Sequence, residues 1–125
     1  MKSALTLSPL GHTWILDLDG TIVKHNGYKL DGHDTLLDGS LDFLNSIPKD
    51  DMIIFLTSRL PEYSKITENF LKEHNIRYDH IIYYAPYGER VLINDRKPSG
   101  LDTAIAVNVE RDAGKAIEFC INSTI

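Results

Sequence analysis

Two aspartates separated by one residue, Asp17 and Asp19, end a short apolar run and precede Gly20 and Thr21. A carboxylate such as that of Asp17 can attack phosphorus in line and form an aspartyl phosphate, while Asp19 could protonate the leaving oxygen and later activate water. Neighbouring carboxylates repel each other unless a cation or a proton neutralises them. The segment therefore predicts a site for a hard divalent cation, for which Mg²⁺ is the natural candidate.

Thr57, Ser58 and Arg59 follow a second apolar run, Met52–Leu56. The two hydroxyls could donate hydrogen bonds to the equatorial oxygens of a transferring phosphoryl group. The alternative for both is a helix cap before Pro61, and the two roles are compatible. Ligands of open α/β sheets collect outside the carboxyl ends of the strands. We therefore expect Thr57 to act in catalysis. We expect the substrate to contact Ser58 and Arg59, together with Gly20 and Thr21 after the first run.

Asp95 and Lys97 follow a third apolar run, residues 90–93. Asp95 would add a third carboxylate for the cation, and an ordinary turn residue is the alternative. Phosphoryl transfer also needs positive charge where negative charge accumulates. We expect Lys97 to supply that charge, with Arg59 and the substrate-contacting Arg90 behind it. Each of these cations could instead be a solvated surface charge.

The elements that must position these residues are short apolar runs alternating with helical patterns. Apolar residues fill consecutive positions in most of the runs, which is typical of strands buried on both faces of a parallel sheet. The expected strands are residues 14–18, 52–56, 80–84, 90–93 and 103–108, and the expected helices are residues 40–47, 61–74 and 111–121. This order predicts an α/β fold: a three-layer α/β/α sandwich with a central, mainly parallel sheet of about five strands.

Composition limits the classes of protein to which the chain can belong. Its 125 residues suit one domain, residues 1–125. A formal net charge of −5 argues against broad attraction to nucleic acid or to anionic membrane surfaces. The one cysteine, Cys120, excludes an intrachain disulfide, and neither a secretory signal nor a bilayer-spanning stretch is evident. We expect a cytoplasmic protein without a membrane partner.

The segments between the expected strands leave no room for an independent cap domain over the site. The polar, glycine-containing segment at about residues 22–38 is expected to form a short flap, and its His25 and His33 could contact a substrate. Without a cap, the crevice should admit a bulky substrate or be closed by a neighbouring subunit of a homo-oligomer.

The motifs resemble those of the haloacid dehalogenase (HAD) superfamily, in the form found in its phosphatases. The run Asp17-Leu18-Asp19-Gly20-Thr21 is similar to the first motif, Thr57 to the second and Asp95 to the fourth. The resemblance covers about residues 14–109 and implies a small, capless HAD-like hydrolase domain of Rossmann type. It also implies Mg²⁺ held by the side chains of Asp17 and Asp95 and by the backbone carbonyl of Asp19.

Two finer similarities and two departures accompany this resemblance. Residues 57–59 with the helix after them resemble phosphatase domains of polynucleotide kinases, and residues 93–98 resemble small phosphatase-like domains encoded near sugar and capsule biosynthesis genes. Asn94 and Arg96 flank Asp95 where a second acidic residue is common. The cation of the third motif has no unambiguous counterpart, and Lys97 is the first choice for it.

The sequence thus predicts a magnesium-dependent phosphomonoesterase that acts through an aspartyl phosphate. Its substrate would be a phosphorylated sugar, which is slightly favoured, a nucleotide or a polynucleotide end. One alternative is a phosphotransferase that uses the same intermediate. Another is a non-catalytic, receiver-like regulatory or binding module.

Overall fold

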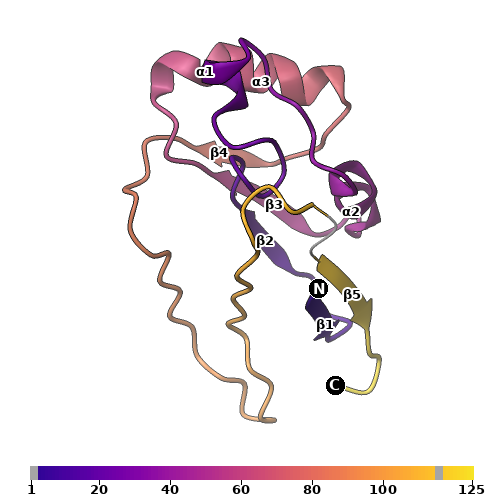
Figure 1. The fold of residues 1–125 in the computed structure, drawn as a ribbon. Coiled ribbons are helices and arrows are strands. Elements are labelled where there is room, and N and C mark those ends of the chain that lie inside the picture. Colours follow the sequence, from indigo (N-terminus) through magenta and orange to yellow (C-terminus); the bar gives the residue numbers. More distant parts are fainter. Residues whose placement is uncertain (1–2, 115–116) are drawn as a thin grey trace.

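Three parallel strands form the sheet that carries the candidate residues (Figure 1). The structure is a computed structural model, and it describes residues 3–114 and 117–125. The three strands are β2 (Thr13–Leu16), β3 (Met52–Leu56) and β4 (His80–Ile82), in the order β2-β3-β4. A second sheet pairs β1 (Ser3–Leu7) with β5 (Ile117–Ile121), also in parallel. The chain is therefore a small α/β domain with parallel strands.

The expected strands at residues 14–18, 52–56 and 80–84 are confirmed. The first begins one residue earlier than expected, and the first and third each end two residues earlier. Parallel pairing places Leu16 of β2 opposite Phe55 of β3, so the two strands end side by side. Phe55 is fully buried, at 0% exposure, and Leu16 at 6% belongs to the same core. This registration brings the residues that follow β2 and β3 to one edge of the sheet.

Two helices, α2 (Ser40–Ser46) and α3 (Ser64–Glu73), pack on the face of the sheet that Trp14 and Phe55 bury. The short helix α1 (Gly27–Leu30) precedes α2 along the chain, and the 3₁₀ turn η1 (Pro61–Tyr63) precedes α3. Leu44 of α2 and Leu71 of α3 join Trp14 and Phe55 in one hydrophobic core. The expected helices at residues 40–47 and 61–74 are thereby confirmed. Among the residues described, no helix has the length and apolar character needed to cross a membrane.

The opposite face of this sheet is more open than the sequence predicted. Side chains alternate along a strand, so those next to the buried ones point to the other face. There, Ile15 is 49% exposed, Met52 41% and Ile82 50%. The expectation of strands buried on both faces is therefore wrong for this arrangement of the chain.

Residues 88–110, which we call the arm, lead away from the sheet and return to it (Figure 1). The strands expected at residues 90–93 and 103–108 are wrong, because this segment has no strand assignment. Its exposed apolar side chains include Val91 at 80% and Ile93 at 88%. At its tip, Lys97 N–H donates to Leu101 O at 3.0 Å and Arg96 pairs with Asp102 at 2.6 Å.

The helix expected at residues 111–121 is also wrong. Its second half forms β5, which pairs along its whole length with β1, and residues 115–116 lie outside the described ranges. The segment suits a strand because Ile117, Phe119 and Ile121 occupy every second position and so share one face of the pleated surface. The five described strands thus form sheets of two and three strands, where the sequence predicted a single central sheet.

Candidate functional site

The residues that follow β2 and β3 line one cavity of about 350 Å³. Its wall contains most of the residues singled out from the sequence, namely Asp17, Asp19, Gly20, Thr21, Thr57, Ser58, Arg59 and Arg90. His25 of the expected flap also borders the cavity. The loops after adjacent parallel strands therefore bring the two expected acids and the two expected hydroxyls together.

Asp17 is the exposed carboxylate of this cavity. Thr21 Oγ1 donates a hydrogen bond to Asp17 Oδ2 at 3.1 Å, which orients the carboxyl group. Surrounding protein atoms remove part of its solvation and raise its pKa above the ordinary value, and the charge of Asp19 adds to this rise. The hydrogen bond from Thr21 and the attraction of Arg90 oppose the rise in pKa without cancelling it. A cation beside Asp17 would therefore be favourable.

A tight turn follows Asp19 and depends on Gly20. Gly20 has φ of +85°, which favours glycine, and its N–H donates to Val23 O at 2.7 Å. The amides of Ile22 and Val23 both donate to Leu18 O, at 2.9 and 3.1 Å. Since Leu18 is 1% exposed, the turn is anchored in the core. The sharp turn expected from Asp-Gly is present and holds the acids at the cavity.

Arg59 is buried at 3% exposure and clamps Asp19. Arg59 Nε donates to Asp19 Oδ2 at 3.0 Å and Nη2 donates to Asp19 Oδ1 at 3.1 Å, a two-pronged ion pair. The guanidinium also binds Asp34 through Nη1 at 3.0 Å and Nη2 at 2.6 Å, and Nη1 donates to Thr67 Oγ1 at 2.8 Å. All five N–H donors of the group are used.

The environment of Arg59 is that of a positioning residue. Burial opposes its charge, but the hydrogen bonds and charges of Asp34 and Asp19 raise the pKa of Arg59 above its ordinary value. Its guanidinium carbon lies 4.0 Å from the centre of the Tyr28 ring, which covers one face. These bonds use the N–H donors of Arg59, so they do not provide the expected contact with a substrate. They fix Asp19 instead.

The segment expected as a flap is packed against the body. Lys24 N–H donates to Thr35 O at 2.9 Å and Leu37 N–H donates to Ile22 O at 2.9 Å, so the two ends of the segment pair. Asp34 is 8% exposed and ties the segment to Arg59. The sequence analysis did not identify Asp34, because a single aspartate in a polar loop carries no local sign of burial.

Thr57 and Ser58 occupy different positions in the cavity wall. Thr57 is 1% exposed, and its Oγ1 accepts a hydrogen bond from Arg59 N–H at 3.1 Å, so the hydroxyl proton remains for donation. Ser58 Oγ accepts a bond from Arg90 Nη2 at 3.3 Å. Neither η1 nor α3 has a side-chain cap. The alternative role of these hydroxyls, capping a helix, is therefore wrong.

Asp95 and Lys97 lie in the exposed arm and do not line the cavity. Thr103 Oγ1 donates to the backbone oxygen of Asp95, and Lys97 takes part in the turn at the arm tip. Within residues 3–114 and 117–125, no group of three or more His, Cys, Asp or Glu side chains is placed to hold a metal ion. The structure thus brings two of the three expected metal-site aspartates together, and Asp95 is elsewhere.

The oxygen donors that remain at the cavity fit Mg²⁺. This ion often binds through one or two carboxylates and completes its shell with waters and substrate phosphate oxygens. Asp17 supplies an exposed carboxylate whose orientation is set by Thr21. The side chain of Asp19 is engaged by Arg59, so its backbone oxygen would be the atom left to hold the ion, as the resemblance implies.

Arg111 is a cavity residue that the sequence analysis missed. Its neighbour Asp112 donates its N–H to Gly20 O at 2.8 Å and accepts the N–H of His25 at Oδ1, also at 2.8 Å. The chain after the arm is thereby fastened to the turn behind the two acids. Nothing local to residue 111 indicates this contact, which joins positions about ninety residues apart.

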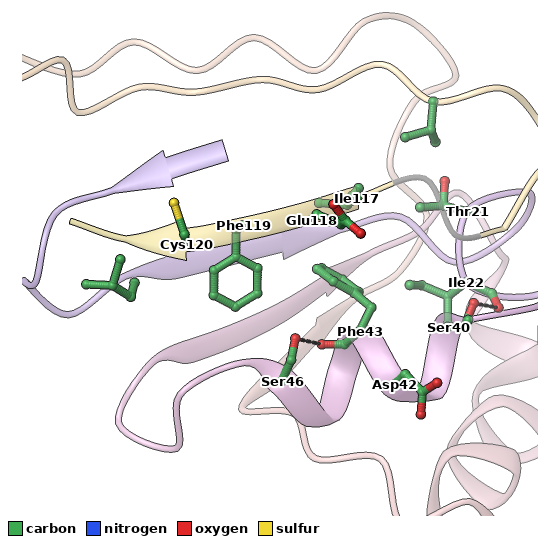
Figure 2. A pocket seen from close by; sticks show the side chains of 13 residues that line it. Thr21, Ile22, Ser40, Asp42, Phe43, Ser46, Ile117, Glu118, Phe119 and Cys120 are labelled. Atoms are coloured by element: carbon green, nitrogen blue, oxygen red, sulfur yellow. Dashed lines mark hydrogen bonds between the residues drawn. The ribbon is translucent and has the colours of Figure 1, made fainter. Parts of the chain in front are cut away.

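A larger hollow of about 650 Å³ lies between α2 and β5 (Figure 2). Phe43 and Phe119 meet edge to face there, with ring centres 6.4 Å apart, and Ser46 Oγ donates to Phe43 O at 2.6 Å. Thr21 borders both hollows, but Asp17, Asp19 and Thr57 line only the smaller one. The smaller cavity is therefore the one that holds the two expected acids and Thr57.

No protein-family model, no curated protein and no solved structure matches this chain.

Proposed function

We propose that this chain is a magnesium-dependent phosphomonoesterase that forms an aspartyl phosphate on Asp17. The observation that carries the proposal is the meeting of Asp17 and Thr57 in one cavity, at the carboxyl ends of adjacent parallel strands. Asp19, fixed by Arg59, lines the same cavity. A carboxylate nucleophile, a hydroxyl donor and an acid–base group are thus available to one bound phosphate ester.

In the first step, a carboxylate oxygen of Asp17 attacks phosphorus, the bond between phosphorus and the ester oxygen breaks, and the leaving oxygen takes the proton carried by Asp19. Thr21 holds the carboxyl group in one orientation, which limits the number of unproductive geometries. Thr57 and Ser58 donate to phosphoryl oxygens. Before the arm closes, Arg90 is bonded to Ser58 and attracts the incoming phosphate ester. Mg²⁺ bound by Asp17 and Asp19 would offset the repulsion between the nucleophile and the phosphate.

In the second step, water attacks the aspartyl phosphate and needs a base to accept its proton. Asp19 lies two residues from Asp17, and Arg59 fixes its carboxyl plane. Both Asp19 oxygens bind Arg59, so proton transfer uses a remaining lone pair or follows release of one of these bonds. The clamp fixes the orientation of Asp19, and Arg59 acts through it.

We further propose that the arm folds onto the free edge of β2 when the cation binds, completing the single central sheet and three-layer sandwich expected from the sequence. In the described part of the chain, β2 pairs with β3 alone, so its other edge can accept a strand. The exposed apolar residues Val91 and Ile93 would become buried by this pairing. Asp95 would then reach Asp17 and supply the third carboxylate. A cation that binds only the closed arrangement would favour closure by mass action.

Phosphate release tests the proposal. Wild type and Asp17→Asn are assayed with Mg²⁺, and after its removal by a chelator, on sugar phosphates, nucleotides and phosphorylated oligonucleotide ends. Lys72→Ala serves as the matched control, because Lys72 is exposed in the last turn of α3. Phosphate release that needs both Mg²⁺ and Asp17 supports the proposal. Product phosphorylated on an added alcohol would indicate the phosphotransferase alternative instead.

One observation favours a second candidate, a receiver-like module that accepts phosphate without rapid turnover. Asp19 is engaged by a buried arginine, and Asp95 is outside the cavity. Such an arrangement would leave water activation slow and the phosphoprotein long-lived. Negligible turnover across the substrate panel, together with a phosphoprotein that persists after substrate removal, would select this candidate.

A further inference from the structure

The cavity around Asp17 contains more positive than negative side chains, although the whole chain has a formal net charge of −5. Asp17 and Asp19 are the carboxylates in its wall. The cations there are Lys29, Arg59, Arg90 and Arg111. Arg59 is already matched by Asp19 and Asp34, whereas no ion pair is found for the other three within the described ranges. This local excess of cations favours an anionic ligand.

Arg111 is held in place although its side chain is exposed. Asp112 binds both Gly20 and His25 through hydrogen bonds of 2.8 Å, which fixes the backbone next to Arg111. A Cβ atom at Gly20 would lie 3.1 Å from Arg111 Cγ, so the glycine lets the arginine stem approach the turn closely. Arg111 is thus positioned beside the two acids by contacts that do not use its guanidinium.

Lys29 and Arg90 reach the cavity from two other elements. Lys29 Nζ lies 5.6 Å from the ring centre of Tyr28 and 5.8 Å from that of Tyr63, so α1 holds it near the aromatic pair. Arg90 is bonded to Ser58 and therefore lies at the phosphoryl-binding hydroxyls. The scissile phosphate accounts for Arg90, but it does not account for Lys29 and Arg111.

We propose that Lys29 and Arg111 form a subsite for a second anionic group on the substrate, separate from the phosphate that is cleaved. This inference rests on the proposed phosphatase function. A cavity of about 350 Å³ suits a small molecule, so the substrate class is a compact phosphate ester that also carries a carboxylate or a second phosphate. A guanidinium binds either group through two parallel hydrogen bonds.

The test compares substrates that differ only in the second anion. One pair is 3-phosphoglycerate and glycerol 3-phosphate, and the other is fructose 1,6-bisphosphate and fructose 6-phosphate. We expect kcat/KM for the member with the second anion to be higher by about tenfold or more, since hydrogen bonds to charged groups are the stronger kind. Arg111→Ala should abolish that preference, Arg111→Lys should retain part of it, and Lys72→Ala should leave it unchanged.

A binding measurement separates this inference from the proposed function. Calorimetry with the Asp17→Asn variant measures the Kd of both members of each pair without turnover. The same measurement is made with the double variant Asp17→Asn/Arg111→Ala. Tighter binding of the second-anion member that disappears in Arg111→Ala supports the subsite even if no phosphate is released by the wild type. Equal Kd values within both pairs, or a preference that survives Arg111→Ala, would overturn it.

Discussion

Arg59 Nε lies 3.0 Å from Asp19 Oδ2, so the aspartate expected to transfer protons is held by a buried cation. The same guanidinium binds Asp34 and Thr67, which connects the expected flap and α3 to the site. Loss of one partner of a buried ion pair leaves an uncompensated charge, whereas loss of an exposed pair costs little. The clamp therefore links the stability of the fold to the position of Asp19.

Arg59→Ala should destabilise the protein by about 3–5 kcal/mol, because Asp34 would remain buried without its cation. Urea unfolding followed by circular dichroism measures this free energy. Lys72→Ala removes an exposed positive charge and should change it by no more than about 0.5 kcal/mol. An Arg59→Ala variant as stable as the wild type would show that the clamp adds nothing to the fold.

Asp19→Asn should separate the two chemical steps. With an aryl phosphate, the leaving group needs no proton, so Asp17 is still phosphorylated and about one equivalent of phenol is released in a burst. The steady rate after the burst should fall by about 10²–10⁴-fold, because water lacks a base. Stopped-flow absorbance with p-nitrophenyl phosphate measures both phases. Steady turnover equal to that of the wild type would remove Asp19 from the mechanism.

Asp17→Asn should make the metal-free protein more stable at neutral pH. Partial loss of solvation raises the folded-state pKa of Asp17 above 3.8, so ionisation costs the folded state free energy. That cost is absent below the unfolded-state pKa, grows as pH rises through the folded-state pKa, and is then constant. Thermal unfolding from pH 3 to pH 8 should show the advantage of the variant only on the less acidic side. Identical midpoints at every pH would contradict the origin of this shift in pKa.

Mg²⁺ should protect the backbone amides of residues 90–94 from hydrogen exchange, because the proposed closure pairs them with β2. Asp95→Asn should weaken this protection, while Asp102→Asn is the matched control, since Asp102 lies in the same arm and binds Arg96 at its tip. Hydrogen exchange with mass spectrometry measures the effect with and without Mg²⁺. Unchanged exchange on addition of saturating Mg²⁺ would exclude closure of the arm.

The local patterns of the sequence predicted the central strands and their polar ends. The run Met52–Leu56 became β3 with the expected bounds, because apolar residues there are bounded by Asp51 and Thr57. The turn at Gly20 followed from residue type, as only glycine adopts its φ without cost. Both features depend on residues near one another in the chain.

Long-range contacts account for most of what the sequence did not predict. Residues 117–121 have apolar positions that suit a helix or a strand, and pairing with β1 at the other end of the chain selects the strand. The bonds of Arg59 to Asp34 and of Asp112 to His25 also join distant segments. The presence of a charged side chain can indicate a site residue, but which residue it binds depends on the fold.

The most direct test of the central claim is detection of phosphate on Asp17. The Asp19→Asn variant is mixed with Mg²⁺ and an aryl phosphate, quenched in acid and examined by peptide mass spectrometry. The control is the double variant Asp17→Asn/Asp19→Asn. The account expects one phosphate on the peptide that contains Asp17 and none in the control. Phosphate release by the wild type that persists in Asp17→Asn, without any phosphopeptide, would contradict it.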